Sequence, residues 1–222
     1  MSATIFSFDE VSLPEFKFPD FIFLDTSFLI NSFCPVPEVP WFPSKTNECC
    51  SAFLDILKKN ACDGKTCLLT SDLVVNEFFH FILKEKAEYV ELTGAFLNHK
   101  KAYERDGKNA VIALMKDHPD ILRKYHPLLT LYIDLMGSIP IEVLKPDDLV
   151  GSEKQTNAVV DGMIEIIKNY NILPSDACNL AISKLLKINT FVVIDRDYHR
   201  IDNINVYTCL SKRAKPCSVC TA

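Results

Sequence analysis

Four acidic side chains stand beside the ends of predicted secondary-structure elements, in four separate parts of the chain. Asp25 ends a short apolar run, and Asp195 ends a second run of the same kind. Asp176 falls in the first turn of one predicted helix, and Glu77 in the second turn of another. An ionisable group at the end of a buried strand is costly unless something compensates for its charge. These acids are therefore the first candidates for chemistry.

Converging carboxylates cannot all ionise side by side without a counter-charge. A hard divalent cation supplies that charge, and ligation by oxygen alone suits Mg²⁺ or Mn²⁺. A cation at the open edge of a sheet can bind a phosphate oxygen and activate water for in-line attack. The chemistry that these residues predict is hydrolysis of a phosphodiester bond.

Each of the acids also has a purely structural interpretation. Asp25 could cap a helix, and Asp176 could simply stabilise a helix N-terminus by a few tenths to about 1 kcal/mol. Asp72 could be the acid that points inward while Glu77 faces solvent. Asp197 is an alternative to Asp195 as the fourth acid, although the strand end favours Asp195.

The elements that must position these acids alternate between strands and helices. Apolar or alternating runs predict strands over residues 21–25, 66–70, 139–144, 190–194 and 204–208. Helical spacing predicts helices over residues 26–33, 48–59, 71–82, 84–135, 152–170 and 174–185. This alternation predicts an α/β fold, with a mostly parallel sheet covered by helices on both faces. The strand ends that carry Asp25 and Asp195 then lie at the same edge, where ligands bind in such sheets.

Four segments resemble, in order, the four motifs of PIN-domain nucleases. They are Phe-Leu-Asp25-Thr-Ser-Phe-Leu-Ile30, Ser-Asp-Leu-Val-Val-Asn-Glu77, Pro-Ser-Asp176-Ala-Cys-Asn-Leu-Ala and Val-Val-Ile-Asp195-Arg-Asp197-Tyr. Each motif is short, but the four in this order and in matching structural contexts are specific. The resemblance covers residues 21–33, about 66–83 and 139–208.

The resemblance implies a three-layer α/β/α sandwich and Mg²⁺- or Mn²⁺-dependent cleavage of single-stranded RNA. The metal-binding and catalytic acids would then be Asp25, Glu77, Asp176 and Asp195. Ser27 would help to position the scissile phosphate or a water, and Asp197 would be a supporting acid. The toxin nucleases of the VapC type are the best-known branch. A toxin role would add an antitoxin or another protein partner, and a homodimer stays open.

The chain is longer than a minimal toxin of this type. Residues 1–20 predict an extended N-terminal arm packed against the body, and residues 21–210 predict a single PIN-like domain. A helical insertion over about residues 84–136 interrupts that domain, and residues 211–222 predict a flexible tail with basic residues and cysteines. These additions bear on the toxin role more than on the nuclease chemistry.

Two other functions compete with the nuclease. A catalytically inactive PIN-like module could bind RNA or a protein without cutting, although it would have no need of four costly acids. A phosphatase with an aspartyl nucleophile would want a second acid two positions after Asp25, where Ser27 stands.

The composition limits the partners and the compartment. A net charge of -5 over 222 residues argues against a protein that grips nucleic acid over its whole surface. It allows a local basic groove, for which the lysines at 84, 86, 100, 101 and 108 are candidates, although charged helices usually face water. The chain shows neither a signal sequence nor an apolar run long enough to cross a membrane, so we expect a cytoplasmic protein without a membrane partner.

The nine cysteines are scattered through apolar segments, which is typical of a reduced cytosolic protein. Cys217 and Cys220 form the only CxxC pair. A structural zinc site needs four ligands, so whether this pair binds metal stays open.

Overall fold

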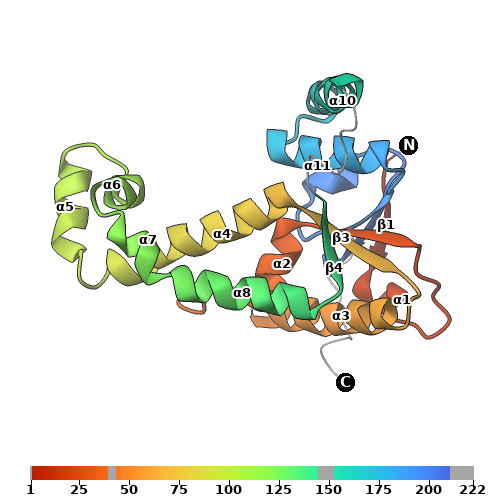
Figure 1. Cartoon of the computed structure of the whole chain (residues 1–222), viewed down its shortest axis with the longest axis horizontal. Helices are drawn as coiled ribbons and strands as arrows, with labels where there is room; N and C mark the ends of the chain where they lie inside the picture. Colours follow the sequence, from red (N-terminus) through yellow and green to blue (C-terminus); the bar gives the residue numbers. More distant parts are fainter. Residues whose placement is uncertain (1, 40–43, 145–152, 211–222) are drawn as a thin grey trace. The chain divides into compact units, whose positions relative to one another are not determined.

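Six parallel strands form the central sheet of the chain (Figure 1). The computed structural model describes residues 2–39, 44–144 and 153–210. The strands are β1 (Thr4–Ser7), β2 (Phe21–Leu24), β3 (Cys67–Ser71), β4 (Ile141–Leu144), β5 (Thr190–Val192) and β6 (Asn205–Thr208). Their order across the sheet is β1-β6-β5-β2-β3-β4, and every neighbouring pair is parallel.

The apolar runs predict the inner strands because a parallel sheet covered on both faces buries every residue of those strands. Ile22, Phe23 and Leu24 of β2 are fully buried, as the run that precedes Asp25 predicts. β5 has the same character but ends at Val192, two residues earlier than predicted. Asp195 therefore stands three residues beyond the end of its strand.

Helices cover the sheet in two layers (Figure 1). On one face lie α2 (Thr26–Phe33) and α3 (Ser44–Cys62), and on the other lie α10 (Glu153–Tyr170) and α11 (Pro174–Leu185). Successive residues of a strand point to opposite faces of the sheet, so Phe191 and Val192 of β5 face different helical layers. The predicted α/β class and three-layer arrangement are confirmed.

The N-terminal segment differs from the predicted arm. β1 pairs with β6 and forms an edge of the sheet, and the short helix α1 (Phe8–Val11) follows it directly. Backbone pairing to β6 satisfies the polar groups on one side of β1. Ser7 and Glu10 form a reciprocal capping box, with the Ser7 amide donating to the Glu10 carboxylate at 2.6 Å. This Ser-x-x-Glu signature is visible in the sequence and predicts the helix start.

The chain divides into two compact units. The first contains the sheet and comprises Met1–Phe33, Pro43–Val75 and Pro140–Ala222; the second comprises Cys34–Phe42 and Asn76–Ile139. The helices of the second unit continue from α4 (Asp72–Lys86) through a π-helix (Ala87–Glu91) to α5 (Leu97–Arg105), α6 (Ala110–Asp117), α7 (Asp120–Lys124) and α8 (His126–Ser138). This unit includes the region for which the sequence predicts a helical insertion.

The second unit has a core of its own. Its buried apolar side chains are Ala87, Leu92, Tyr103, Leu114, Ile121 and Tyr125. Within it, the buried carboxylate of Glu91 accepts hydrogen bonds from the Lys124 ammonium and the Tyr125 hydroxyl. Burial by itself raises the pKa of Glu91, but these hydrogen bonds outweigh it and hold the pKa below its ordinary value.

Among the described helices, none is long and apolar enough to cross a membrane. Cys49 is disulfide-bonded, which corrects the expectation of uniformly reduced thiols. The tail at residues 211–222, with its CxxC pair, lies outside the described residues.

Candidate active site at the carboxyl edge of the sheet

Asp25 follows β2 directly, at the carboxyl edge of the sheet. Its backbone amide donates to the Val192 carbonyl of β5 at 3.1 Å, so strand pairing extends as far as the acid itself. The residue is only 3% exposed. A carboxylate so remote from solvent needs hydrogen-bond donors or a cation.

Three donors from two segments hold the Asp25 carboxylate. The amide and the hydroxyl of Ser27 donate to Oδ2 at 3.0 and 2.7 Å, and the Tyr198 hydroxyl donates to Oδ1 at 3.1 Å. Because Ser27 lies in the first turn of α2, Asp25 also caps this helix. Capping does not preclude ligand binding, since the two oxygens of a carboxylate offer about four lone-pair sites.

Ser27 links the ends of two neighbouring strands. Its hydroxyl oxygen also accepts a hydrogen bond from the Ile194 amide at 3.0 Å, just beyond β5. The single hydroxyl proton is donated to Asp25. In this arrangement Ser27 orients Asp25 and the segment after β5, and contact with a phosphate stays a prediction.

Asp195 and Asp197 have different surroundings. Asp195 is exposed, and its Oδ1 accepts a hydrogen bond from the Asp197 amide at 2.9 Å. The Asp197 carboxylate forms an ion pair with Arg200 in a 3-10 helix over Asp197–Arg200. Of the two neighbours, Asp195 is therefore the acid whose carboxylate is not engaged in an ion pair with Arg200.

Asp176 is half-buried in the first turn of α11. This end of α11 is tied to the end of β3, because the Ser71 hydroxyl donates to Oδ1 of the fully buried Asn179 at 2.7 Å. β3 is a direct neighbour of β2, the strand that Asp25 follows. The end of α11 that carries Asp176 and the end of β2 thus stand at the same edge.

Asp72, the alternative acid from the sequence, lies at this edge too. The Ser71 hydroxyl accepts a hydrogen bond from the Val74 amide at 3.2 Å, so Ser71 caps α4 and Asp72 does not. Within the described residues, Oδ1 of Asp72 is buried and has no hydrogen-bond partner. Burial, and then the charge of Asp72, raise the pKa of the Cys178 thiol, so Asp72 lies close to the N-terminal part of α11.

Glu77 is half-buried in the second turn of α4 and belongs to the second unit. The structure therefore assigns Asp25, Asp176 and Asp195 to the sheet-bearing unit and Glu77 to the helical one. Convergence of Glu77 with the other acids stays a prediction.

The donor types at this edge suit a hard cation. They are carboxylate oxygens, and the orphaned Oδ1 of Asp72 is the kind of buried polar atom that a cation satisfies. In the part of the chain that the structure describes, no group of three or more His, Cys, Asp or Glu side chains is gathered closely enough to hold a metal ion. The residues thus fit Mg²⁺ or Mn²⁺ by chemistry, and binding would require their side chains to move together.

Tyr198 is the site residue that the sequence does not single out. It is 1% exposed and reaches Asp25 across 173 positions of the chain. Its proximity to Asp195 in the sequence is visible, but an aromatic residue after a strand usually indicates core packing. Only the fold shows that its hydroxyl meets a buried carboxylate.

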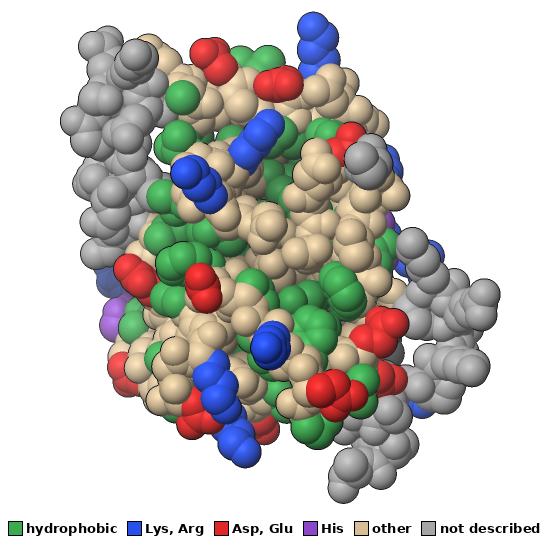
Figure 2. All heavy atoms as spheres, turned by 90° about the vertical axis from the view of Figure 1, so that its right-hand side faces the viewer, with side chains coloured by type: hydrophobic (Ala, Val, Ile, Leu, Met, Phe, Trp, Pro, Cys, Tyr) green, Lys and Arg blue, Asp and Glu red, His purple; other side chains and the backbone are tan. Residues whose placement is uncertain are grey.

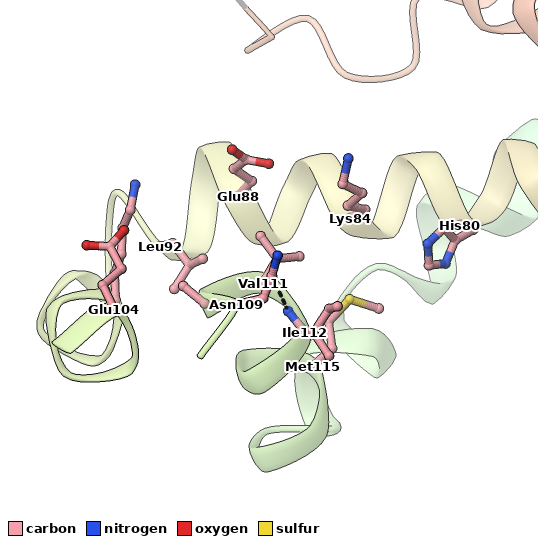
Figure 3. A pocket seen from close by; sticks show the side chains of 11 residues that line it. His80, Lys84, Glu88, Leu92, Glu104, Asn109, Val111, Ile112 and Met115 are labelled. Atoms are coloured by element: carbon pink, nitrogen blue, oxygen red, sulfur yellow. Dashed lines mark hydrogen bonds between the residues drawn. The ribbon is translucent and has the colours of Figure 1, made fainter. Parts of the chain in front are cut away.

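The lysines considered for a basic groove are distributed among different environments in the second unit. Lys84 and Lys100 line a cleft of about 470 Å³ that also contains Glu88 and Glu104. Figure 3 shows Lys84 and Glu88 projecting from the same side of their helical segment. Lys86 is paired with a glutamate at position 38. This cleft has mixed charge, which does not favour a nucleic-acid backbone.

One face of the molecule is shown in Figure 2. Acidic and basic side chains are interspersed there among apolar ones. This distribution agrees with the small negative net charge of the chain.

Comparisons with known proteins leave the family open. No protein-family model matches the sequence, and no curated protein matches it. A chain in the crystal structure of VapBC2 from Rickettsia felis bound to a DNA fragment from their promoter is similar, with 14% identity and a TM-score of 0.43. The match covers 85% of this chain and 98% of that chain. At this level, similarity carries no argument, so the protein is defined by its own architecture, an α/β sandwich with an all-parallel sheet.

Proposed function

We propose that the protein is a metal-dependent endoribonuclease that hydrolyses phosphodiester bonds in single-stranded RNA. The observation that carries this proposal is the Asp25 carboxylate, buried at the carboxyl end of a central strand and fixed by Ser27 and Tyr198. Burying a charge is costly, and holding it in place with three donors pre-organises it for a ligand. The resemblance of four segments to PIN-domain motifs supports the same reaction.

The buried and the exposed residues of the site would have different roles. Asp25 and Asp176 would hold Mg²⁺ or Mn²⁺ together with Asp195 and Glu77, and Asp72 is a further donor at the same edge. When bound, the cation would polarise a phosphate oxygen and lower the pKa of a water. Asp195, the exposed acid, is suited to accept a proton from the attacking water. Ser27 and Tyr198 keep Asp25 in one orientation.

Asp195→Asn tests the chemistry with little risk to the fold, because the residue is exposed and the new amide oxygen can still accept the bond from Asp197. We expect the cleavage rate of a fluorescent single-stranded RNA in Mn²⁺ to fall by about a hundredfold or more. Asp25→Asn should do the same. Asp134→Asn, an exposed acid of the second unit, is the matched control and should retain full activity.

If Asp195→Asn and Asp25→Asn, verified as folded by circular dichroism, cut RNA as fast as the wild type, these acids do not perform the reaction. A wild-type rate that is unchanged by EDTA would remove the metal from the proposal.

A module that binds RNA or a protein partner without cutting is the second candidate. It is favoured by the lack of a gathered metal-binding group among the described residues. Calorimetric titration separates the two functions. A nuclease binds Mn²⁺ through its acids and loses this affinity in Asp25→Asn, whereas a binding module retains RNA affinity with neither Mn²⁺ binding nor cleavage.

A further inference from the structure

Two cysteines that are far apart in the sequence meet in the first unit. Cys50 lies on α3 and is fully buried, and Cys209 follows β6 and is half-buried. Their thiols share a hydrogen bond. Cys49, the neighbour of Cys50, is already disulfide-bonded. The nuclease chemistry uses none of these sulfur atoms.

Aromatic packing supports the position of this pair. The rings of Phe53 on α3 and Tyr207 on β6 pack edge to face with their centroids 6.5 Å apart. Cys50 precedes Phe53 by three residues, which is almost one helical turn, so the two share a face of α3. Cys209 lies just beyond β6, two residues after Tyr207. The contact between Phe53 and Tyr207 therefore places α3 beside the end of β6 that leads to Cys209.

The pKa of the Cys209 thiol differs in direction from those of two other cysteines beside the sheet. The hydrogen bond with Cys50, assisted by a backbone hydrogen bond, holds the pKa of Cys209 below its ordinary value, although burial opposes this. In contrast, burial raises the pKa of Cys67 and of Cys178. A lowered pKa increases the fraction of thiolate, which is the nucleophile in disulfide exchange.

We propose that Cys50 and Cys209 form a reversible disulfide on reaction with a small-molecule disulfide such as oxidised glutathione. The Cys209 thiolate attacks one sulfur of glutathione disulfide and releases one glutathione thiolate, which leaves a mixed disulfide on Cys209. Cys50 loses its proton and attacks the Cys209 sulfur, and the second glutathione thiolate departs. Two protein thiols are oxidised, and one glutathione disulfide is reduced to two thiols.

The bond would join α3 to the end of β6. β6 is tied to the candidate site, because the Val193 amide donates to the Tyr207 carbonyl at 3.1 Å, one residue before the amide that binds Ser27. The proposal goes beyond the nuclease activity, and its test does not depend on that activity.

Peptide mapping of the full chain tests the bond directly. The protein is reduced, exchanged into oxidised glutathione, blocked with an alkylating reagent and digested with trypsin. We expect residues 46–58 and 201–212 to appear as a disulfide-linked pair, and the pair to vanish after dithiothreitol. The exposed Cys62 is the reference thiol and should carry glutathione without forming a link to Cys209.

Variants assign the bond to one of the vicinal cysteines. The linked pair of peptides should persist in Cys49→Ser and be lost in Cys50→Ala and in Cys209→Ser. Oxidation should raise the thermal stability of the wild-type chain, and it should not do so in the variants that lack the link. A link that follows Cys49 instead of Cys50 would overturn the proposal. So would a Cys209 peptide found only alkylated or glutathionylated, or thiols protected by a bound zinc ion that a chelator releases.

Discussion

The hydroxyl of Ser27 donates a hydrogen bond of 2.7 Å to the same Asp25 oxygen that accepts the Ser27 backbone amide at 3.0 Å. These two hydrogen bonds fix the orientation of the carboxylate that follows the buried strand β2. The same hydroxyl accepts the Ile194 amide, so a single side chain holds together two strand ends at the sheet edge.

Removal of this hydroxyl should therefore weaken the fold locally. Ser27→Ala leaves the Ile194 amide without its acceptor and deprives Asp25 of one donor, and we expect a loss of about 1–3 kcal/mol in the free energy of unfolding. Urea denaturation followed by circular dichroism measures the change. Ser51→Ala, at an exposed position of α3, should change stability by less than about 0.5 kcal/mol. Equal effects of the two substitutions would show that the Ser27 hydroxyl does not contribute to the free energy of unfolding in this way.

Tyr198 and Ser27 should act on Asp25 together. Tyr198→Phe removes the donor to Oδ1 and should cost about 1–3 kcal/mol, because the buried carboxylate loses a hydrogen bond. Combined with Ser27→Ala, it should give a non-additive loss, since both donors serve one carboxylate. A double-mutant cycle in urea gives the coupling energy. In an Asp25→Asn background the coupling should shrink, and a coupling that is unchanged there would mean that it does not pass through Asp25.

The orphaned oxygen of Asp72 leads to a prediction about metal binding. Asp72→Asn removes the charge and keeps the shape of the side chain, so we expect Mn²⁺ affinity to fall while stability in EDTA changes little. Isothermal titration calorimetry gives the affinity, and thermal unfolding in EDTA gives the stability. Asp120→Asn, another acid in a first helical turn but strongly exposed, is the matched control and should bind Mn²⁺ like the wild type. Unchanged affinity in Asp72→Asn would exclude Asp72 from the metal site.

Glu91 should make the stability of the second unit sensitive to acid. Its pKa in the folded chain is lowered from the ordinary 4.5, so its contribution is complete above that value and is lost as the pH falls through the folded pKa. The wild type should therefore lose unfolding free energy more steeply between roughly pH 5 and pH 3 than Glu91→Gln does. Urea denaturation at several pH values gives both slopes. The exposed Glu104→Gln should follow the wild type, and parallel curves for Glu91→Gln would contradict the prediction.

Local patterns in the sequence were sufficient for the fold class and for most of the strands. Short apolar runs predict β2 and β5, and the acid after each run predicts where chemistry could occur, because burial of both faces of a strand leaves a distinct composition. Residues 1–20 predict an arm and not the edge strand β1, because an edge strand carries a weaker signal and its partner β6 follows only at Asn205, where Thr4 pairs. Its pairing depends on the whole sheet.

Tertiary structure alone decided which side chains meet. The sequence places Asp25, Tyr198 and Ser71 at the ends of elements, but hydrogen bonds such as that from Tyr198 to Asp25 arise only when the strand order brings distant segments to one edge. The contact between Cys50 and Cys209 has the same origin, in the packing of α3 on β6. The sequence by itself determined the inner strands, most of the helices and the candidate acids, because propensity and periodicity are local. The partners of those acids depend on non-local packing, which no local pattern encodes.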